Sequence, residues 1–394
     1  MVALFLGKEH HARGDVAYYF RKLSQLAEVG LDDSLVEYPT PVVWLLELPR
    51  VLGGRGETAY LVAFMALMML LDAALTAWLW RRGHGSGSTA AALYWTLFIF
   101  LVGPLAYLRF DLVPAVLAAA ALLLLARVPA VAGGLVAVGA AIKLWPALLV
   151  AGLLGPRERR PAMWWGFVAT GVGLVAASVL AGGWRRLFSP LGWQGERGLQ
   201  IESVWATPTM VNVLAHPGQY VIAMSPYQAY EIFGPGVSTM LVVATAATVL
   251  GGLAIIALLV RAWRSPGHGL RAGAAVMTAV VAIMIVTNKT FSPQYLVWLG
   301  GPLAVLVLAR GREPWWPRER VLLVLGLGLA ALTHLVFPLF YSWLTDAGPG
   351  LGRTTLTTVL AVRNIGMLAF TLLAFTQAWS MLGACRTEER SAEV

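Results

Sequence analysis

The stretch AALYWTLFIFLVGPLAYLRFDLVPAVLAAAALLLLA, residues 91–126, decides the fold class of this chain. It contains two apolar runs that are separated only by Arg109-Phe110-Asp111. An α-helix rises about 1.5 Å per residue, so an apolar run of about 20 residues crosses the roughly 30 Å hydrocarbon core of a bilayer. The stretch therefore predicts two consecutive membrane segments with a short charged link between them.

The rest of the chain repeats this pattern. Hydrophobic residues make up 58% of the 394 residues and charged residues 12%, against about a half and a quarter in soluble domains. Apolar runs occur at residues 58–80, 90–108, 111–126, 129–154, 162–182, 237–262, 272–288, 294–309, 320–341 and 355–383. We therefore expect an all-α fold, a polytopic transmembrane helical bundle of about 10–12 membrane segments with external loops, in a single membrane domain over residues 1–394.

The formal net charge of +9 comes from basic residues in the short loops between apolar runs, as the positive-inside rule describes. The excess therefore indicates orientation, and we expect no nucleic-acid partner. Five basic clusters follow alternate ends of the runs: Arg81-Arg82; Arg157, Arg159 and Arg160; Arg261, Arg264 and Arg271; Arg310, Arg312, Arg318 and Arg320; and Arg386 and Arg390. Placing all five in the cytoplasm leaves residues 1–57, 183–236 and 342–354 outside.

A polar interruption, Lys143-Leu144-Trp145-Pro146, divides the apolar run 129–154. Because the flanking basic clusters are both placed inside, this run has to leave and return as two short half-helices that meet near the outer surface. Non-helical backbone at membrane depth is tolerated only where it lines a protein cavity. We therefore expect Lys143 to lie in a functional site rather than in lipid.

Residues 1–57 form the first external segment, in which we expect amphipathic helices. No signal peptide is visible and Val2–Leu6 resembles the end of a lost helix, so we expect Met1 to be an internal start with one more helix upstream. Translocation of the tail without a signal is the alternative. The large external loop 183–236 contains aromatic residues that suit a segment lying on the outer leaflet, namely Trp184, Trp193 and Trp205.

Four polar clusters fall at the expected outer surface. They are Asp15 with Tyr18 and Tyr19, followed by Glu37-Tyr38-Pro39; Arg109-Phe110-Asp111; Gln200-Ile201-Glu202-Ser203; and Asn288-Lys289-Thr290-Phe291-Ser292-Pro293-Gln294-Tyr295. Their convergence on one side is informative, because other residues fixed the topology. Each also has a structural interpretation: Asp15 could cap the helix-like run Val16–Ala27, and Arg109 could simply pair with Asp111.

Charges inside apolar runs tend to mark a function, so Lys143 and Arg363 favour a site, with structural pairing to an acid as the alternative. Asp72 lies in the cytoplasmic half of its run, where a structural hydrogen bond is the better interpretation. The histidines show no metal-ligand spacing, and the chain lacks Walker A, Gly-x-Ser-x-Gly and His-Glu-x-x-His sequences. The single cysteine, Cys385, excludes an intramolecular disulfide.

Several of these motifs resemble those of membrane glycosyltransferases with the C-type fold. The matching features are Gly14-Asp15 before a first short helix, Glu37-Tyr38-Pro39, Lys143-Leu144-Trp145-Pro146 after a Gly/Ala-rich run, and Ser292-Pro293-Gln294-Tyr295 opening a late run. More narrowly, the set is similar to the bacterial polyprenol-phosphate-mannose-dependent mannosyltransferases of glycosyltransferase family 87. Gln200-Ile201-Glu202-Ser203 also resembles an outer-loop sequence of actinobacterial members of that family. One departure is that the family has a membrane helix before the acidic loop, and this chain shows none.

The resemblance implies transfer of a sugar, mannose by analogy, from a polyprenol-phosphate-linked donor to a hydroxyl of a glycolipid or lipoglycan acceptor. The reaction would invert the anomeric centre at the extracytoplasmic face of the cell membrane, with neither a cofactor nor a metal. Asp15 matches the catalytic carboxylate. The candidates for binding the donor phosphate are Lys143, Lys289, Arg109 and Arg363, and those for binding substrate are Tyr18, Tyr19, Glu37, Tyr38, Asp111, Gln200, Glu202, Gln294 and Tyr295.

Two other classes of protein fit part of the pattern. A multi-pass transporter or lipid flippase would suit buried Lys143 and Asp72 with a broken helix, although no pair of halves with matching broken segments is evident. A membrane scaffold without chemistry would not need ionisable residues gathered at one face. The sequence therefore favours the enzyme.

Overall fold

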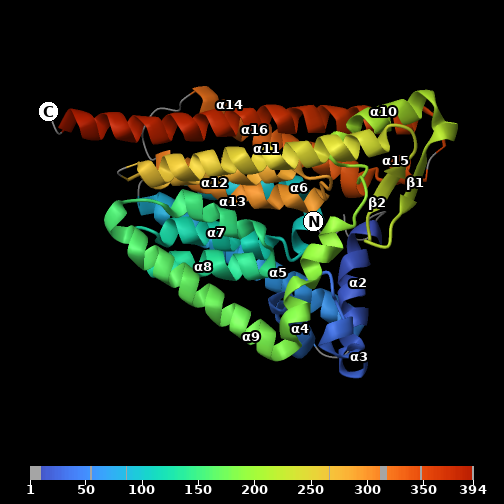
Figure 1. Ribbon diagram of the computed structural model, residues 1–394, viewed down its shortest axis with the longest axis horizontal. Helices are drawn as coiled ribbons and strands as arrows, with labels where there is room; N and C mark the ends of the chain where they lie inside the picture. The colour runs from blue at the N-terminus through green and yellow to red at the C-terminus, as the bar shows by residue number, and fades with distance from the viewer. Residues whose placement is uncertain are drawn as a thin grey trace.

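The computed structural model describes residues 10–53, 56–85, 87–265, 267–310, 317–346 and 348–392. It is 82% helical, and seven of its helices are long and apolar enough to cross a membrane. Figure 1 shows long helices lying roughly alongside one another, with a short hairpin at one end. The predicted all-α, multi-pass helical bundle is confirmed. The expected lost helix at Val2–Leu6 lies outside the described residues.

Every apolar run of the sequence coincides with a helical segment. The long spans are α5 (Glu57–Gly85), α6 (Ala90–Val102) continued by η1 (Gly103–Tyr107), α9 (Arg160–Gly195), α11 (Val237–Arg264), α12 (Leu270–Thr287), α14 (Pro317–His334) continued by η7 (Leu335–Leu339), and α16 (Leu351–Ala392). The other three runs form shorter helices, α7 (Leu112–Leu124), α8 (Pro129–Ile142) and α13 (Val297–Arg310). In the most apolar 18-residue stretch of α12, 78% of the residues are buried, whereas in that of α9 only 6% are buried. Helix α9 therefore turns its apolar surface outward.

The predicted break in the run 129–154 is confirmed. Helix α8 ends at Ile142, Lys143 is extended with φ −141° and ψ 133°, and the chain continues as the 3₁₀ helix η2 (Trp145–Leu153). Proline has no backbone N–H and its ring clashes with the preceding turn, so Pro146 opens a new helix more readily than it continues an old one. The break sits against protein, since Trp145 and Leu149 are buried.

The described part of the segment 1–57 folds as helices α2 (His10–Ser24), α3 (Leu26–Asp33) and α4 (Thr40–Gly53). Helix α2 already includes His10, so Asp15 lies inside it and the expectation that Asp15 caps a helix starting at Val16 is wrong.

The segment 183–236 begins as helix, because α9 continues past a kink at Gly183, where φ is 69°. Trp184 is 64% exposed, Trp205 packs against the core, and the side chain of Trp193 lies outside the described residues. The segment then contains η4 (Val204–Ala206), α10 (Thr207–Ala215), η5 (Pro217–Gln219) and a hairpin of β1 (Val221–Met224) and β2 (Tyr230–Phe233), in which Val221 pairs with Phe233. The hairpin is a small exception to the all-α expectation.

Basic residues tie the ends of several spans together. Arg160 is the first residue of α9 and directly follows η3 (Arg157–Arg159). Its guanidinium donates to the carbonyl of Trp263 at 2.8 Å and to that of Ser265 at 2.7 Å. Arg261 donates to the Trp379 carbonyl at 3.0 Å, and Arg271 pairs with Glu319 at 2.6 Å. In Figure 1 the C-terminal end of α16 lies at the opposite end of the bundle from α2 and the β1–β2 hairpin. The basic residues of these contacts therefore lie away from α2 and the hairpin.

Glycines lie at some of the close contacts between helices. A side chain at Gly133 would run into the backbone of Met163 in α9. Gly251 of α11 lies against Thr287, whereas its neighbour Gly252 has nothing within 4 Å of a Cβ position. Gly252 is therefore not a packing site.

Candidate functional site

The short link between η1 and α7 forms two ion pairs that reach in different directions. The Arg109 Nε lies 2.8 Å from the Asp15 carboxylate, and the Lys143 Nζ lies 2.6 Å from Asp111. The expectation that Arg109 pairs with Asp111 is therefore wrong. These contacts fix α2 and the break after α8 to the start of α7, so Asp15, Arg109, Asp111 and Lys143 belong to one site.

Asp15 is the accessible acid of this set. Its side chain is 36% exposed, whereas that of Asp111 is 2% exposed and is fully engaged. Arg109, whose side chain is 6% exposed, supports Asp15 from the protein side. A carboxylate held by one buried cation with a face toward the surface is suited to receiving a proton from a substrate hydroxyl.

Tyrosines surround the Asp15 pair. The Tyr18 hydroxyl donates to Glu37 at 2.8 Å. The buried ring of Tyr19 and the half-buried ring of Tyr38 pack on Phe110, with centroids 5.9 and 5.3 Å away. Burial is the largest cause of a raised pKa at Tyr18, Tyr19 and Tyr38. These phenols therefore stay protonated and act as hydrogen-bond donors.

Lys143 is held by an aromatic box. Its Nζ lies 5.2 Å from the ring centroid of Phe110, of Tyr295 and of Trp298, in addition to its contact with Asp111. Cation–π contacts of this kind stabilise an ammonium where water is scarce. The side chain is still 20% exposed, so an anion can approach it.

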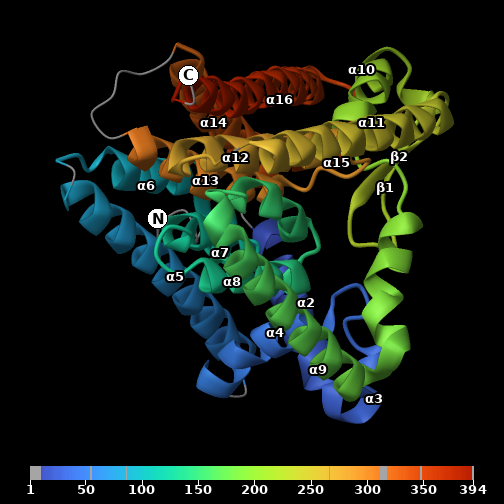
Figure 2. The same ribbon diagram turned by 60° about the vertical axis from the view of Figure 1, so that its left-hand side comes forward.

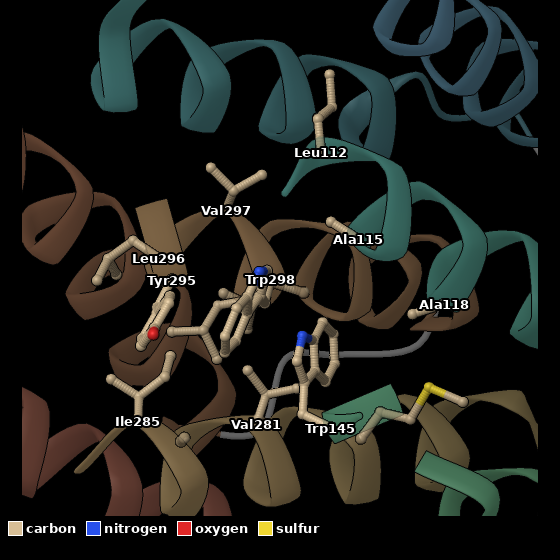
Figure 3. Close-up of a cluster of buried hydrophobic side chains, with 14 of the residues drawn as sticks. Leu112, Ala115, Ala118, Trp145, Val281, Ile285, Tyr295, Leu296, Val297 and Trp298 are labelled. Atoms are coloured by element: carbon tan, nitrogen blue, oxygen red, sulfur yellow. The ribbon is translucent and has the colours of Figure 1, made fainter. Parts of the chain in front are cut away.

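Three of the aromatic rings form a stack. Trp298 lies between Tyr295 and Trp145, with centroid distances of 4.2 and 4.6 Å, and Figure 3 shows the three rings in a row. Trp298 also donates from Nε1 to Asp111 at 2.8 Å, whereas Trp145 Nε1 is buried with no hydrogen-bond partner among the described residues. Sequence reasoning missed Trp298. Its spacing of three residues from Tyr295, which puts both on one helix face, could have indicated it.

Arg363 and Glu202 form a separate buried ion pair. Their charged groups are 2.7 Å apart, and their side chains are 0% and 1% exposed. The guanidinium also donates to the Glu202 carbonyl at 2.5 Å and lies 4.2 Å from the Phe291 ring centroid. Burial raises the pKa of Glu202, and Arg363 opposes that rise. Asn364, which sequence reasoning missed, donates to the carbonyl of Ser203 at 3.2 Å. The pair anchors the external loop to α16.

The segment after α12 connects this anchor to the aromatic stack. The side-chain oxygen of Gln200 accepts a hydrogen bond from the backbone N–H of Phe291 at 2.5 Å. The backbone N–H of Gln200 donates to the Lys289 carbonyl at 3.2 Å. Lys289 donates from Nζ to the Gly195 carbonyl at 2.8 Å, and burial lowers its pKa. Gln294 lies half-buried in η6 (Pro293–Leu296), next to Tyr295. The four polar clusters are thus joined, with Lys143 bridging Phe110 of the link and Tyr295.

Asp72 does not take part. It accepts hydrogen bonds from Trp95 Nε1 and the Tyr107 hydroxyl, both at 2.6 Å, so its expected structural hydrogen bonding is confirmed. Among the described residues, no group of three or more His, Cys, Asp or Glu side chains could hold a metal ion. The chemistry that the site itself offers is that of one accessible carboxylate, two partly exposed ammonium groups and aromatic faces.

The family model described as Glycosyltransferase family 87 matches residues 37–287, which is more than half of the chain. The matched stretch contains Glu37, the link 109–111, Lys143 and Glu202, while Asp15, Lys289 and Arg363 lie outside it. No curated protein and no solved structure matches the chain.

The Arg363–Glu202 pair gives a prediction about stability. Arg363→Met should lower the free energy of unfolding by about 3–5 kcal/mol, because it leaves the Glu202 carboxylate buried without its cation. Adding Glu202→Gln should recover part of this loss. Denaturant unfolding in micelles measures both effects. The matched control is Arg50→Met, which breaks a pair with 40% and 23% exposed side chains and should cost about 0–1 kcal/mol. Equal losses for Arg363→Met and Arg50→Met would contradict the anchoring role.

Proposed function

The chain belongs to glycosyltransferase family 87 and is a membrane transferase, and we propose that it moves a sugar from a polyprenol-phosphate-linked donor to a hydroxyl of a lipid-linked acceptor. The observation that carries the proposal is the accessible Asp15 carboxylate, which Arg109 links to the Lys143 aromatic box. We propose mannose as the sugar, a glycolipid or lipoglycan as the acceptor, and the extracytoplasmic face of the cell membrane as the location.

Asp15 acts as the general base in this proposal. A hydroxyl is a poor nucleophile, and a carboxylate about 3 Å away can take its proton as the new glycosidic bond forms. Arg109 contacts Oδ2 of Asp15, which leaves Oδ1 for the acceptor hydroxyl. Direct displacement by that hydroxyl inverts the anomeric centre. Because Arg109 is occupied in this way, its proposed role is to position Asp15 rather than to bind phosphate.

The leaving group is a lipid phosphate that is already stable as an anion, so no general acid is required. Cations near the developing charge stabilise the transition state. Lys143 and Lys289 are partly exposed and supply this charge. Arg363 is buried against Glu202, so we assign both residues to positioning the 288–298 segment, together with Gln200.

Aromatic and polar side chains near Asp15 and Lys143 suit a sugar. The half-buried Gln294 suits a sugar hydroxyl, and the buried Tyr295 ring supports it from beside Lys143. Tyr18 and Glu37, which hydrogen-bond to each other beside Asp15, suit hydroxyl groups of the acceptor. Tyr19 and Asp111 are buried and Tyr38 is half-buried, and we assign all three to supporting these groups from behind. The transporter or flippase alternative has no comparable support, because the family comprises transferases.

Asp15→Asn should lower kcat by about 10²–10⁴-fold, the usual contribution of a general base. The substitution keeps the shape of the side chain but removes its proton affinity. Steady-state sugar transfer from polyprenol-phosphate mannose by the purified protein measures the effect. Asp33→Asn is the matched control, since Asp33 is an exposed acid at the end of α3. Transfer by Asp15→Asn within twofold of the unsubstituted protein would remove Asp15 from this role.

Lys289 predicts a particular pH dependence. Burial lowers its pKa, so the ammonium loses its charge at a lower pH than an ordinary lysine of pKa about 10.4. Because the charged form binds the donor phosphate, kcat/KM for the donor should fall as pH rises through the lowered pKa. Lys289→Arg should move this fall to higher pH, since arginine stays charged. Identical alkaline limbs for the two proteins would show that Lys289 does not meet the phosphate.

The orientation can be tested with two exposed glycines at opposite ends of the bundle. Gly218 of η5 and Gly269 before α12 both have open space around a Cβ position. With Cys385→Ser as background, a membrane-impermeant maleimide applied to intact cells should label Gly218→Cys and leave Gly269→Cys unlabelled. Labelling of Gly269→Cys alone would reverse the orientation and place the site in the cytoplasm.

A further inference from the structure

A groove runs along the outside of the bundle between α11 and α12, with η2 forming part of its wall. These two helices lie side by side (Figure 1 and Figure 2). The groove has a volume of about 410 Å³, within the usual range of small-ligand sites. Its lining includes Ala244, Gly252 and Ile255 of α11 and Met284 of α12. Helix α11, which forms one side of the groove, also has exposed apolar residues, since Val249 is 59% exposed.

The groove presents an apolar surface even at its three threonines. The hydroxyl of Thr245 donates to the Leu241 carbonyl at 2.9 Å, that of Thr248 to the Thr287 carbonyl at 2.8 Å, and that of Thr287 to the Ile283 carbonyl at 2.9 Å. Each threonine of the groove therefore satisfies its polar atom on the backbone and leaves its methyl group to the lining. Such a surface suits hydrocarbon rather than a sugar.

One end of the groove is polar. Asn288 accepts hydrogen bonds from the amide and the hydroxyl of Thr290, both at 3.0 Å, which leaves its two amide N–H groups to donate elsewhere. Lys289 donates one of its three N–H groups to Gly195 and forms no ion pair with a described residue. This end therefore offers several donors and a positive charge, which is complementary to a phosphate group.

The polar end leads to the candidate site along two walls. Leu148 lines the groove, and three residues earlier in η2 Trp145 stacks on Trp298. Lys289 lines the groove, and six residues later Tyr295 lies against Lys143. The groove and the aromatic box therefore share the chain segments 145–148 and 289–295.

We propose that this groove holds the isoprenoid chain of the donor, with the donor phosphate at Asn288 and Lys289. The assignment rests on the proposed function and adds the place and direction in which the donor lies. An isoprenoid chain suits the site, because its lining is apolar and includes the small residues Ala244, Gly251 and Gly252. The chain enters from lipid while the phosphate stays at the membrane surface.

The test fills the groove without disturbing the fold. Gly252→Leu places a side chain where nothing lies within 4 Å of the Cβ position, and Gly171→Leu does the same on α9, away from the groove. Binding of undecaprenyl phosphate, which carries no sugar, is measured on the full-length protein in micelles. Gly252→Leu should weaken binding at least about tenfold, since several buried methylene contacts are lost, and Gly171→Leu should leave it unchanged. Dimethylallyl phosphate, which carries a single isoprene unit, should bind both variants alike.

The outcomes separate this proposal from the proposed function. Sugar transfer with equal donor affinity in Gly252→Leu and Gly171→Leu would overturn the groove and leave the function standing. Specific loss of undecaprenyl phosphate binding in Gly252→Leu would support the groove. If the unsubstituted protein also transferred no sugar, that result would count against the proposed function. Equal competition by phosphatidylglycerol at the same concentration would show a general lipid surface and overturn the assignment. Lys289→Ala should weaken binding of both the long and the short isoprenoid phosphate, and unchanged binding of both would also overturn it.

Discussion

A charge in a poorly solvated interior is stable only next to an opposite charge, and two such pairs extend from one short link of this protein. The link 109–111 sits between two membrane segments, where desolvation of an unpaired arginine or aspartate would be costly. Arg109 meets Asp15 of α2, and Asp111 meets Lys143 at the break after α8. Three segments that are distant in sequence are thereby held at one end of the bundle. The position of the candidate base follows from this requirement.

The paired charges differ in how far they remain accessible, and the difference sorts their roles. Asp111, Glu202 and Arg363 are almost completely buried and have several partners each, so they resist movement. Asp15 and Lys143 keep 36% and 20% of their side chains exposed. In the proposed reaction, the buried members act as supports and the exposed members meet the substrate. A site whose ion pairs differ in accessibility in this way combines rigidity with reactivity.

Much of this arrangement follows from the sequence, and the rest depends on long-range geometry. Apolar runs and the Lys143–Pro146 interruption predicted the spans and the break, because hydrophobic length and proline chemistry are local properties. The partner of Arg109 could not be predicted, since residues 109 and 111 lie on non-helical backbone whose direction depends on the packing of η1 and α7. The interpretation of Asp15 as a helix cap was wrong because α2 begins at His10, five residues before Asp15. Trp298 escaped notice because a tryptophan in an apolar run is ordinarily core.

The break after α8 has a consequence that an unbroken helix could not provide. The chain starts anew in η2 after an extended Lys143. Trp145 joins the aromatic stack, and Leu148, one 3₁₀ turn later, lines the groove. Lys143 is freed to turn toward Asp111. Irregular backbone inside a membrane protein is stable only when protein covers it, and the buried side chains around η2 provide that cover. The same break therefore supplies the cation and joins the apolar groove to the polar site, which is the geometry that a reaction between a lipid-borne donor and a surface hydroxyl requires.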